Sequence, residues 1–418
     1  METASWVERR DSGAADAPPS AGRLPGVVFT MRYGDDVGLV WRTVAQHRDL
    51  TARSLQGVAR SILAYPELTG NPAYLPHWAR PAQADFYDYS PANRPRLAEF
   101  IRRHRIAVVV FMAAPATTVD LDFLRGLGLR TINTENGSQP PGLTQPFVKR
   151  AAKMLVRRVL GRQLHDLHVA HSRGQCDFLR SFAQVPQRRL RLVAEGIDTG
   201  HFLPGDRAEA CARLDLDPGT SWIMAAAQAR PEKRVDQVIR AIDAARRRRP
   251  GLPVGFIFVG GGQMLADWRN LAAGLPNAAD YRFVGAQSDL RPYYRAASLF
   301  VHGSLRETFG FVLAEAMASG LPVVATRTHG SADIVADGHT GRLVGTDDWD
   351  GFTAAVVDYL DHPDLRARHG QAGRHRCEQL FAIGRQAEAF AGLIRPLVPE
   401  GQAGKQRRGV ARHPGANP

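Results

Sequence analysis

Residues 300–344 constrain the fold of this chain more than any other stretch. They begin with an apolar run that ends at His302, continue as a polar loop, and take a helical spacing of apolar residues over 311–319. Gly320 stands where helices commonly end, and a second apolar run follows at 323–326. The stretch is therefore predicted to be strand, loop, helix, strand. In such units ligands bind where the loop leaves the first strand and the helix begins.

Two glutamates frame this predicted helix start. Glu307 lies just before it, and Glu315 lies inside the helix, about two turns further on. The N–H groups of Gly310, Phe311 and Val312 are expected to be free there, which suits a phosphate, and Gly310 allows close approach to the backbone. Carboxylates on either side can accept hydrogen bonds from sugar hydroxyls. The pattern indicates a nucleotide-sugar site; the alternative is two solvated glutamates near a helix end.

The residues from Glu307 to Thr326, ETFGFVLAEAMASGLPVVAT, resemble the glutamate–seven–glutamate motif of glycosyltransferase family 4. The resemblance covers roughly residues 165–395 and is faint before them. It implies an α/β chain with the GT-B fold, in which two doubly wound parallel-sheet (Rossmann-like) domains face each other across a cleft. It also implies retaining sugar transfer, with Glu307 at the donor sugar and Glu315 at the nucleotide ribose.

Two cations follow a strand predicted at 222–227. Arg230 and Lys233 can hold a pyrophosphate against the helix N-terminus, so we assign them, with Glu307, to catalysis. Of 54 basic residues only four are lysine, which indicates that Lys233 serves a site requiring a compact point charge. Many relatives have an arginine where Gln228 stands here. The alternative for Lys233 is a solvated lysine that caps a helix.

Other site residues are placed by the resemblance alone. Relatives hold the nucleotide base in a loop after a strand, and the corresponding loop here contains Ala286–Gln287. Relatives contact the acceptor in a second position, the loop after the first strand, which is predicted here at 26–31. Gly34, Asp35 and Gly38 lie in that second position, where a plain tight turn remains an equal alternative. Asn136 stands where relatives often carry a histidine, and an amide cannot serve as acid or base. The glycines at 260–262 would also permit close approach to the donor.

The length of 418 residues favours two domains. The predicted organisation is a disordered N-terminus (1–24), an acceptor-side domain (25–203) and a nucleotide-sugar-binding domain (204–383). A helix crossing back to the first domain (384–395) and a disordered basic tail (396–418) follow. Residues 61–96, rich in Pro, Tyr and Trp, read either as a long acceptor-side loop or as several short elements.

The net charge of +13 raises the question of nucleic-acid binding. The excess is almost entirely arginine, which indicates genomic base composition, and no aromatic residues alternate with the basic ones to stack bases. We therefore expect no nucleic-acid partner. Residues 147–164 form a basic amphipathic pattern that fits either an anionic membrane surface or an ordinary packed helix. The chain lacks a signal peptide and an apolar span, so a cytoplasmic location is expected, with peripheral contact at the inner face of the membrane as the alternative.

The predicted function is retaining transfer of a hexose-type sugar from a UDP-sugar or GDP-mannose to a hydroxyl of a cell-envelope glycan, a lipid-linked sugar or a small natural product. No metal or other cofactor is expected, because Arg230 and Lys233 supply positive charge and the Cys and His spacings form no ligand set. Two alternatives remain: a nucleotide-sugar epimerase on the same fold, and a basic membrane- or nucleic-acid-binding protein.

Overall fold

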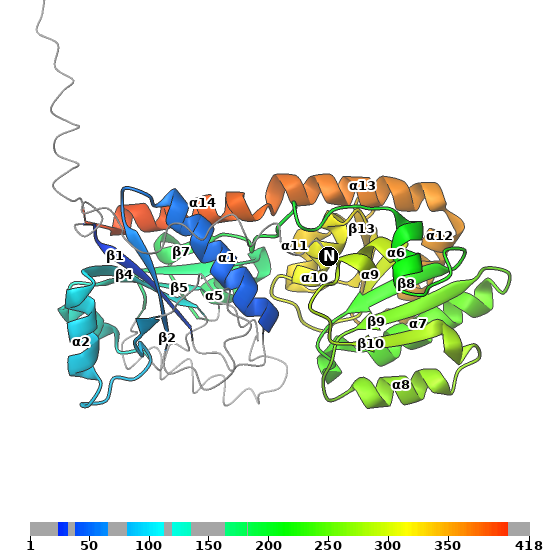
Figure 1. The fold of residues 1–418 in the computed structure, drawn as a ribbon, viewed down its shortest axis with the longest axis horizontal. Coiled ribbons are helices and arrows are strands. Elements are labelled where there is room, and N and C mark those ends of the chain that lie inside the picture. The colour runs from blue at the N-terminus through cyan, green and yellow to red at the C-terminus, as the bar shows by residue number, and fades with distance from the viewer. Residues whose placement is uncertain are drawn as a thin grey trace, which may run out of the picture. The chain divides into compact units, whose positions relative to one another are not determined.

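A computed structural model describes residues 24–31, 38–65, 82–112, 119–134, 164–181 and 183–399 (Figure 1). The chain divides into two compact units. Described residues up to 134, at 164–169 and at 387–399 belong to the first unit, and those from 170 to 386 to the second. The units are described separately below.

The first sheet has seven strands in the order β3-β2-β1-β4-β5-β6-β7. The strand pairings recorded for it are parallel, and the buried strands are rich in Val, Ile and Phe, as parallel sheets covered on both faces require. The strands are β1 (Gly26–Met31), β2 (Arg60–Tyr65), β3 (Ala82–Gln83), β4 (Ile106–Met112), β5 (Arg130–Thr134), β6 (Leu167–Ala170) and β7 (Leu190–Leu192).

Helices cover this sheet from both faces. On one face, Leu97 of α2 and Leu124 of α3 belong to the same core cluster as Val109 of β4. On the other, Phe390 of α14 contacts Phe29 of β1 and His47 of α1, with ring centroids 6.2 and 5.3 Å apart. The last helix therefore stabilises the first unit. These helices are α1 (Gly38–Ser54), α2 (Arg94–Arg103), α3 (Leu121–Gly126) and α14 (Ile383–Ile394).

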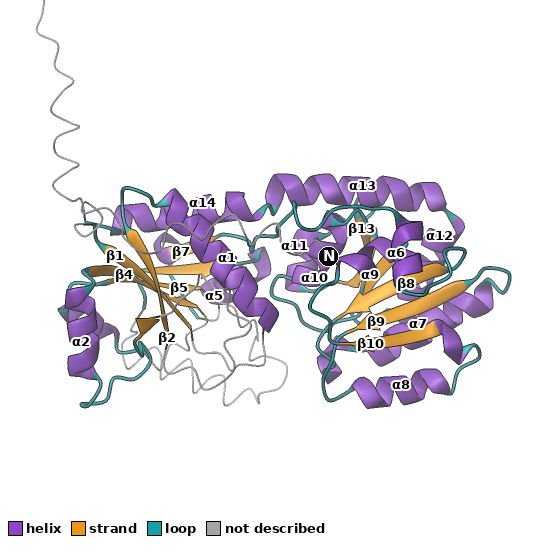
Figure 2. Ribbon diagram, viewed as in Figure 1, coloured by secondary structure: helices purple, strands orange, loops and turns teal. Residues whose placement is uncertain are grey.

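The second sheet has six strands in the order β10-β9-β8-β11-β12-β13, all paired in parallel (Figure 2). The order reverses between β8 and β11, and in open α/β sheets ligands bind outside the carboxyl ends of the strands at such a switch point. The strands are β8 (Ser221–Ala226), β9 (Val254–Val259), β10 (Tyr281–Gly285), β11 (Leu299–His302), β12 (Val323–Thr326) and β13 (Gly341–Val344).

Alternate residues of each strand face opposite layers of helices. In β8, Ile223 joins the core formed with α7, α8 and α12, whereas Met224 joins the core formed with α6, α9, α10, α11 and α13. The sheet is therefore doubly wound. The helices are α6 (Arg207–Arg213), α7 (Val235–Arg248), α8 (Leu265–Ala273), α9 (Arg291–Ala296), α10 (Phe311–Ala318), α11 (His329–Ile334), α12 (Trp349–Asp361) and α13 (Pro363–Leu380); α5 (Arg173–Ser181) packs on α11.

Cys377 joins α13 to α10. Its side chain is fully buried, and its Sγ donates a hydrogen bond to the carbonyl oxygen of Ala314 at 3.4 Å. Burial raises the pKa of the thiol to about 12. The thiol is therefore protonated and unreactive while the two helices remain packed.

The expected α/β class and the strand–loop–helix–strand unit are confirmed, with α10 and β12 at or within one residue of their predicted bounds. One detail differs. Gly38, predicted to lie in the turn after the first strand, is already the first residue of helix α1, which runs to Ser54. Residues 61–96 hold most of β2, all of β3 and the start of α2, so the described part of this region agrees with the alternative of several short elements. Val312, in the helical pattern of residues 311–319, packs against the core cluster of this unit and is partly buried.

Residues 396 and 397, predicted to belong to a disordered tail, instead lie in a 3₁₀ turn at Arg395–Leu397. Residues 1–23, 400–418 and the basic stretch 147–163 lie outside the described residues. Among the helices that are described, none combines the length and apolarity needed to cross a lipid bilayer.

Candidate functional site

Lys233 and Glu307 meet at the switch point of the second sheet. Lys233 ends a 3₁₀ turn, η4 (Pro231–Lys233), in the segment after β8, and Glu307 lies in the loop after β11. The Nζ of Lys233 is 2.7 Å from Oε2 of Glu307, and the two side chains are only 19% and 17% exposed. Both residues were singled out from the sequence, but for separate roles. The structure brings them into one ion pair.

His302, the last residue of β11, completes this cluster. Its Nε2 is 3.1 Å from the same Oε2 of Glu307, and its side chain is 4% exposed. Burial alone would raise the pKa of Glu307, but the hydrogen bond from His302 and the charge of Lys233 outweigh it and lower the pKa to about 2. Glu307 is therefore ionised at neutral pH. An ionised carboxylate only accepts hydrogen bonds, so Nε2 of His302 carries the proton.

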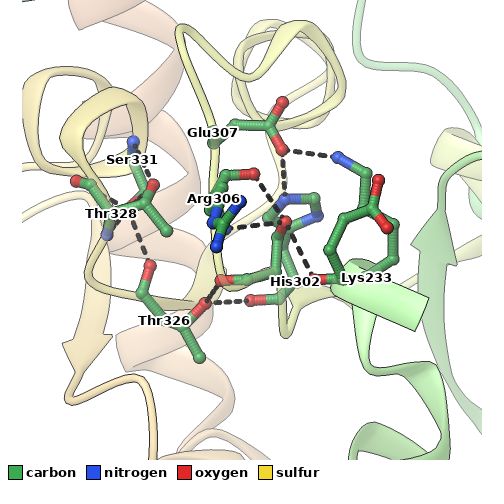
Figure 3. A network of polar contacts seen from close by, with 9 residues as sticks. Lys233, His302, Arg306, Glu307, Thr326, Thr328 and Ser331 are labelled. Carbon is green, nitrogen blue, oxygen red and sulfur yellow. Dashed lines mark hydrogen bonds and ion pairs between the residues drawn. The ribbon is translucent and has the colours of Figure 1, made fainter. Parts of the chain in front are cut away.

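The loop that carries Glu307 is held by hydrogen bonds to neighbouring segments, as Figure 3 shows in part. The N–H of Leu305 donates to the carbonyl of Glu232 at 2.8 Å, which ties the loop to η4. From β12, Oγ1 of Thr326 donates to the carbonyl of Ser304 at 2.6 Å. These bonds fix Glu307 and Lys233 relative to each other from both sides.

The helix α11 packs against the same loop. The N–H of Gly330 donates to the carbonyl of Glu307 at 2.9 Å, and a Cβ on Gly330 would lie 2.4 Å from the carbonyl oxygen of Phe309. Only glycine permits that approach without displacing the loop. A capping box between Thr328 and Ser331 fixes the start of α11.

Gly310 starts α10 in a left-handed conformation, with φ of +100°, that L side chains rarely adopt. The N–H of Leu313 donates to the carbonyl of Gly310 at 3.0 Å, whereas the N–H groups of the partly buried Phe311 and Val312, at the first two positions of the helix, have no partner within it. Further along, Oε2 of Glu315 accepts a hydrogen bond from the Tyr294 hydroxyl at 2.8 Å. Burial and the charge of Glu315 raise the pKa of Tyr294 well above its ordinary range, so the phenol stays a donor. Sequence reasoning did not identify Tyr294.

Arg230 and Arg234 flank Lys233 differently. Arg230 is exposed at the start of η4, and no hydrogen bond or ion pair of its side chain is found among the described residues. Arg234 adopts a left-handed backbone with φ of +50°. Its guanidinium lies 4.7 Å from the ring centroid of Trp349, 2.9 Å from Asp347 and 2.5 Å from the carbonyl of Thr346. These contacts stabilise a strained residue directly beside Lys233.

Replacing Arg234 separates the side-chain contacts from the backbone strain. Arg234→Ala loses the contacts and keeps the strain, whereas Arg234→Gly loses the contacts and relieves the strain. We expect the alanine variant to be less stable than the glycine variant by about 1 kcal/mol. Urea unfolding of both proteins measures the difference. Equal stability of the two variants would show that the left-handed backbone at this position carries no strain.

The loops after β8, β9 and β10 are joined by backbone hydrogen bonds. The N–H of Gly260 donates to Gly285 at 2.9 Å, and that of Ala229 to Gly261 at 2.8 Å. A Cβ on Gly260 would lie 1.8 Å from the carbonyl oxygen of Ala227. The structure therefore gives the glycine triplet a packing role between loops, where the sequence suggested only access for a donor.

The residues proposed to hold the nucleotide base lie in the loop after β10. Ala286 is exposed, and the partly buried Gln287 donates from Nε2 to the carbonyl of Val284 at 2.8 Å. The side chain of Gln287 therefore stabilises the loop, and base binding by Ala286 and Gln287 stays a prediction.

The acceptor-side residues are not placed. Gly34, Asp35 and Asn136 lie outside the described residues, and Gly38 is the first residue of α1. Their role, like membrane contact by 147–164, stays a prediction. Within the described parts of the chain, no group of three or more His, Cys, Asp or Glu side chains is arranged to hold a metal ion.

Comparison with known sequences identifies relatives of this chain. The family described as "Glycosyl transferases group 1" matches residues 206–376. A GDP-mannose-dependent alpha-(1-6)-phosphatidylinositol monomannoside mannosyltransferase of Mycolicibacterium smegmatis is 31% identical over 295 residues, covering 68% of this chain and 75% of the relative. A D-inositol 3-phosphate glycosyltransferase of Streptomyces avermitilis is 33% identical over 223 residues, or 51% of this chain and 48% of the relative. The chain thus spans about half the length of the inositol phosphate enzymes it matches.

Solved structures share the fold. A glycosyltransferase from Rickettsia africae superposes with a TM-score of 0.70 at 14% identity, covering 90% of this chain and 98% of that one. HepE from Anabaena, in complex with UDP-glucose, gives a TM-score of 0.69 at 16% identity, covering 89% and 99%. At these identities the likeness concerns the fold, which agrees with the predicted GT-B class.

Proposed function

Since the chain belongs to the group 1 glycosyl transferases, as its resemblance to glycosyltransferase family 4 predicted, we propose that it transfers a sugar from a nucleotide-sugar to an acceptor hydroxyl. The observation that carries the proposal is the cluster of Lys233, His302 and Glu307 at the switch point, beside the N-terminus of α10. It offers a positive charge, a hydroxyl acceptor and an anion-binding helix start within one site.

The donor's pyrophosphate lies against the first turn of α10 and the charges of Lys233 and Arg230. An ammonium has three N–H groups, and only one is needed for Glu307, so Lys233 can also contact a phosphate. Negative charge grows on that phosphate as the glycosidic bond breaks, and groups fixed before the reaction stabilise it most effectively. Glu307 holds the sugar hydroxyls, and Glu315, oriented by Tyr294, holds the ribose.

The transfer breaks the bond from the anomeric carbon to the phosphate oxygen and forms the bond to the acceptor oxygen on the same face. The acceptor proton passes to the departing phosphate. This route needs no separate general base, and Glu307, with a pKa of about 2, would be a poor one at neutral pH. We propose a hexose-type sugar from a UDP-sugar or GDP-mannose. The acceptor would be a cell-envelope glycan, a lipid-linked sugar or a small natural product.

The deciding experiment measures release of UDP or GDP from UDP-glucose, UDP-N-acetylglucosamine and GDP-mannose, with and without candidate acceptors. The acceptors should include inositol phosphates and phosphatidylinositol, because two relatives are named for such compounds. Release that depends on an acceptor supports transfer. Conversion of the donor sugar to its epimer without an acceptor would instead establish the epimerase alternative.

We expect transfer to proceed without a divalent metal. Lys233, Arg230 and the N–H groups of α10 supply the positive potential that a metal would otherwise bring to the pyrophosphate. Initial rates in EDTA should equal those in Mg²⁺ or Mn²⁺. Activity that EDTA abolishes and Mn²⁺ restores would contradict this expectation.

A further inference from the structure

The proposed function leaves the buried His302 without a role. It ends β11, between β8 and β12, and its side chain is 4% exposed although an imidazole is polar. The position before it, Val301, is apolar and fully buried. Burying a polar ring instead of another apolar side chain costs stability unless its hydrogen bonds are satisfied. The partner that the structure gives the His302 ring is Glu307.

The geometry is asymmetric with respect to the two carboxylate oxygens. Lys233 and His302 both contact Oε2 of Glu307, at 2.7 and 3.1 Å. No contact recorded among the described residues uses the other oxygen, Oε1. The two donors also come from different segments: Lys233 from η4 after β8, and His302 from the strand β11 itself. One oxygen is thus fixed from two directions while the other remains to accept a hydrogen bond.

The two donors differ in rigidity. The Lys233 ammonium is carried on a flexible four-carbon stem and has further N–H groups directed elsewhere. The imidazole of His302 has only two side-chain torsions, and its backbone belongs to the parallel ladder with Ala325. Among the described residues, Lys233 is the charged side chain recorded in contact with the Glu307 carboxylate besides His302 itself, and the backbone of neighbouring Arg306 bonds to the Ser304 hydroxyl. His302 is therefore the group best placed to fix the rotation of the carboxylate.

We propose that His302 is a positioning residue for the transfer: its Nε2–H holds Oε2 of Glu307 so that Oε1 is presented to a hydroxyl of the donor sugar. This inference rests on the proposed function, in which Glu307 holds that sugar. His302 itself touches neither sugar nor phosphate. Its removal should slow turnover by loosening the sugar and leave the nucleotide's binding unchanged.

The test compares four variants of the full chain. His302→Leu removes the donor and keeps the approximate volume. His302→Gln places an amide N–H near the former Nε2, and His302→Asn carries the same amide on a shorter side chain that does not reach. His369→Leu is the matched control, because His369 is also buried in the second unit and bonded to one side chain, Tyr359, at 2.7 Å. The measurements are kcat and KM for release of UDP or GDP, and calorimetric binding of the free nucleoside diphosphate.

We expect kcat to fall roughly 10- to 100-fold in His302→Leu and His302→Asn, because each loses one hydrogen bond to a charged group. In His302→Gln, kcat should recover largely. Binding of UDP or GDP should stay within about twofold of wild type in all four variants. If His302→Leu does not fold, the difference in kcat between His302→Gln and His302→Asn still tests the positioning role.

Wild-type kcat in His302→Leu, or in His302→Asn, overturns the inference and leaves the proposed function standing. So does an equal loss in His302→Gln and His302→Asn, or a comparable loss of kcat in His369→Leu. If the wild-type protein itself releases no nucleoside diphosphate from any of the donors, the proposed function fails instead.

Discussion

Replacing Lys233 with alanine is expected to lower kcat/KM roughly 30- to 1,000-fold. This corresponds to a loss of about 2–4 kcal/mol of transition-state stabilisation. The lysine faces the expected phosphate position and also neutralises Glu307 at 2.7 Å. Its removal therefore weakens the cradle and leaves a largely buried carboxylate with His302 alone. Lys233→Arg should not restore activity, because a guanidinium fork differs in size and geometry from a point charge.

Arg230→Ala should also lower kcat/KM, while the exposed Arg240 on α7 provides a charge-matched control whose replacement should have no effect. Steady-state kinetics with the best donor, together with thermal unfolding to confirm the fold, measure these effects. Near-wild-type kinetics in both the Lys233 and Arg230 variants would remove these residues from the catalytic assignment.

Glu307→Gln and Glu315→Gln are expected to impair different steps, namely turnover and nucleotide binding. Glu315 lies on α10 and is oriented by Tyr294, so its replacement should weaken binding of the free nucleoside diphosphate by roughly 1.5–3 kcal/mol, the worth of a charged hydrogen bond. Glu307 lies in the preceding loop and should affect kcat instead, because the sugar is no longer held for attack. Glu307→Gln should therefore bind the nucleoside diphosphate nearly as well as wild type.

Calorimetry of both variants with UDP or GDP separates these outcomes. Tyr294→Phe refines the test, since it removes the hydroxyl that Glu315 accepts from and keeps the carboxylate, and should weaken binding less than Glu315→Gln. If both glutamate variants lose nucleotide affinity equally, or if only Glu307→Gln does, the assignment of sugar and ribose to the two glutamates is wrong.

The second half of the chain was predictable because its signals are local. The strands of its sheet are short apolar runs, and the pattern alone places β12 at its observed bounds and α10 within one residue of them. The first half gave weaker signals. β2 begins with Arg60, whose guanidinium donates to the carbonyls of Leu24 and His104, so a charged residue interrupts the apolar pattern typical of a buried strand.

The sequence singled out residues of the candidate site but not the contacts between them. Glu307, Lys233 and Glu315 follow from residue type and position relative to strand and helix. His302 looked like the end of an apolar run, and Tyr294 lies in a short helix with an unremarkable pattern. Their roles depend on partners 5 and 21 positions away in the chain, which only the folded structure brings within reach.

The packing of Cys377 between α13 and α10 provides a native reporter of the helix that carries Glu315. A thiol with a pKa near 12 reacts with an alkylating reagent only after the two helices separate. The labelling rate at this sulfur therefore reports how often α13 separates from α10, a local opening that costs less free energy than global unfolding. A ligand that binds along α10 would lower the alkylation rate of Cys377. Mass spectrometry of the labelled protein could therefore rank donors before any acceptor is known.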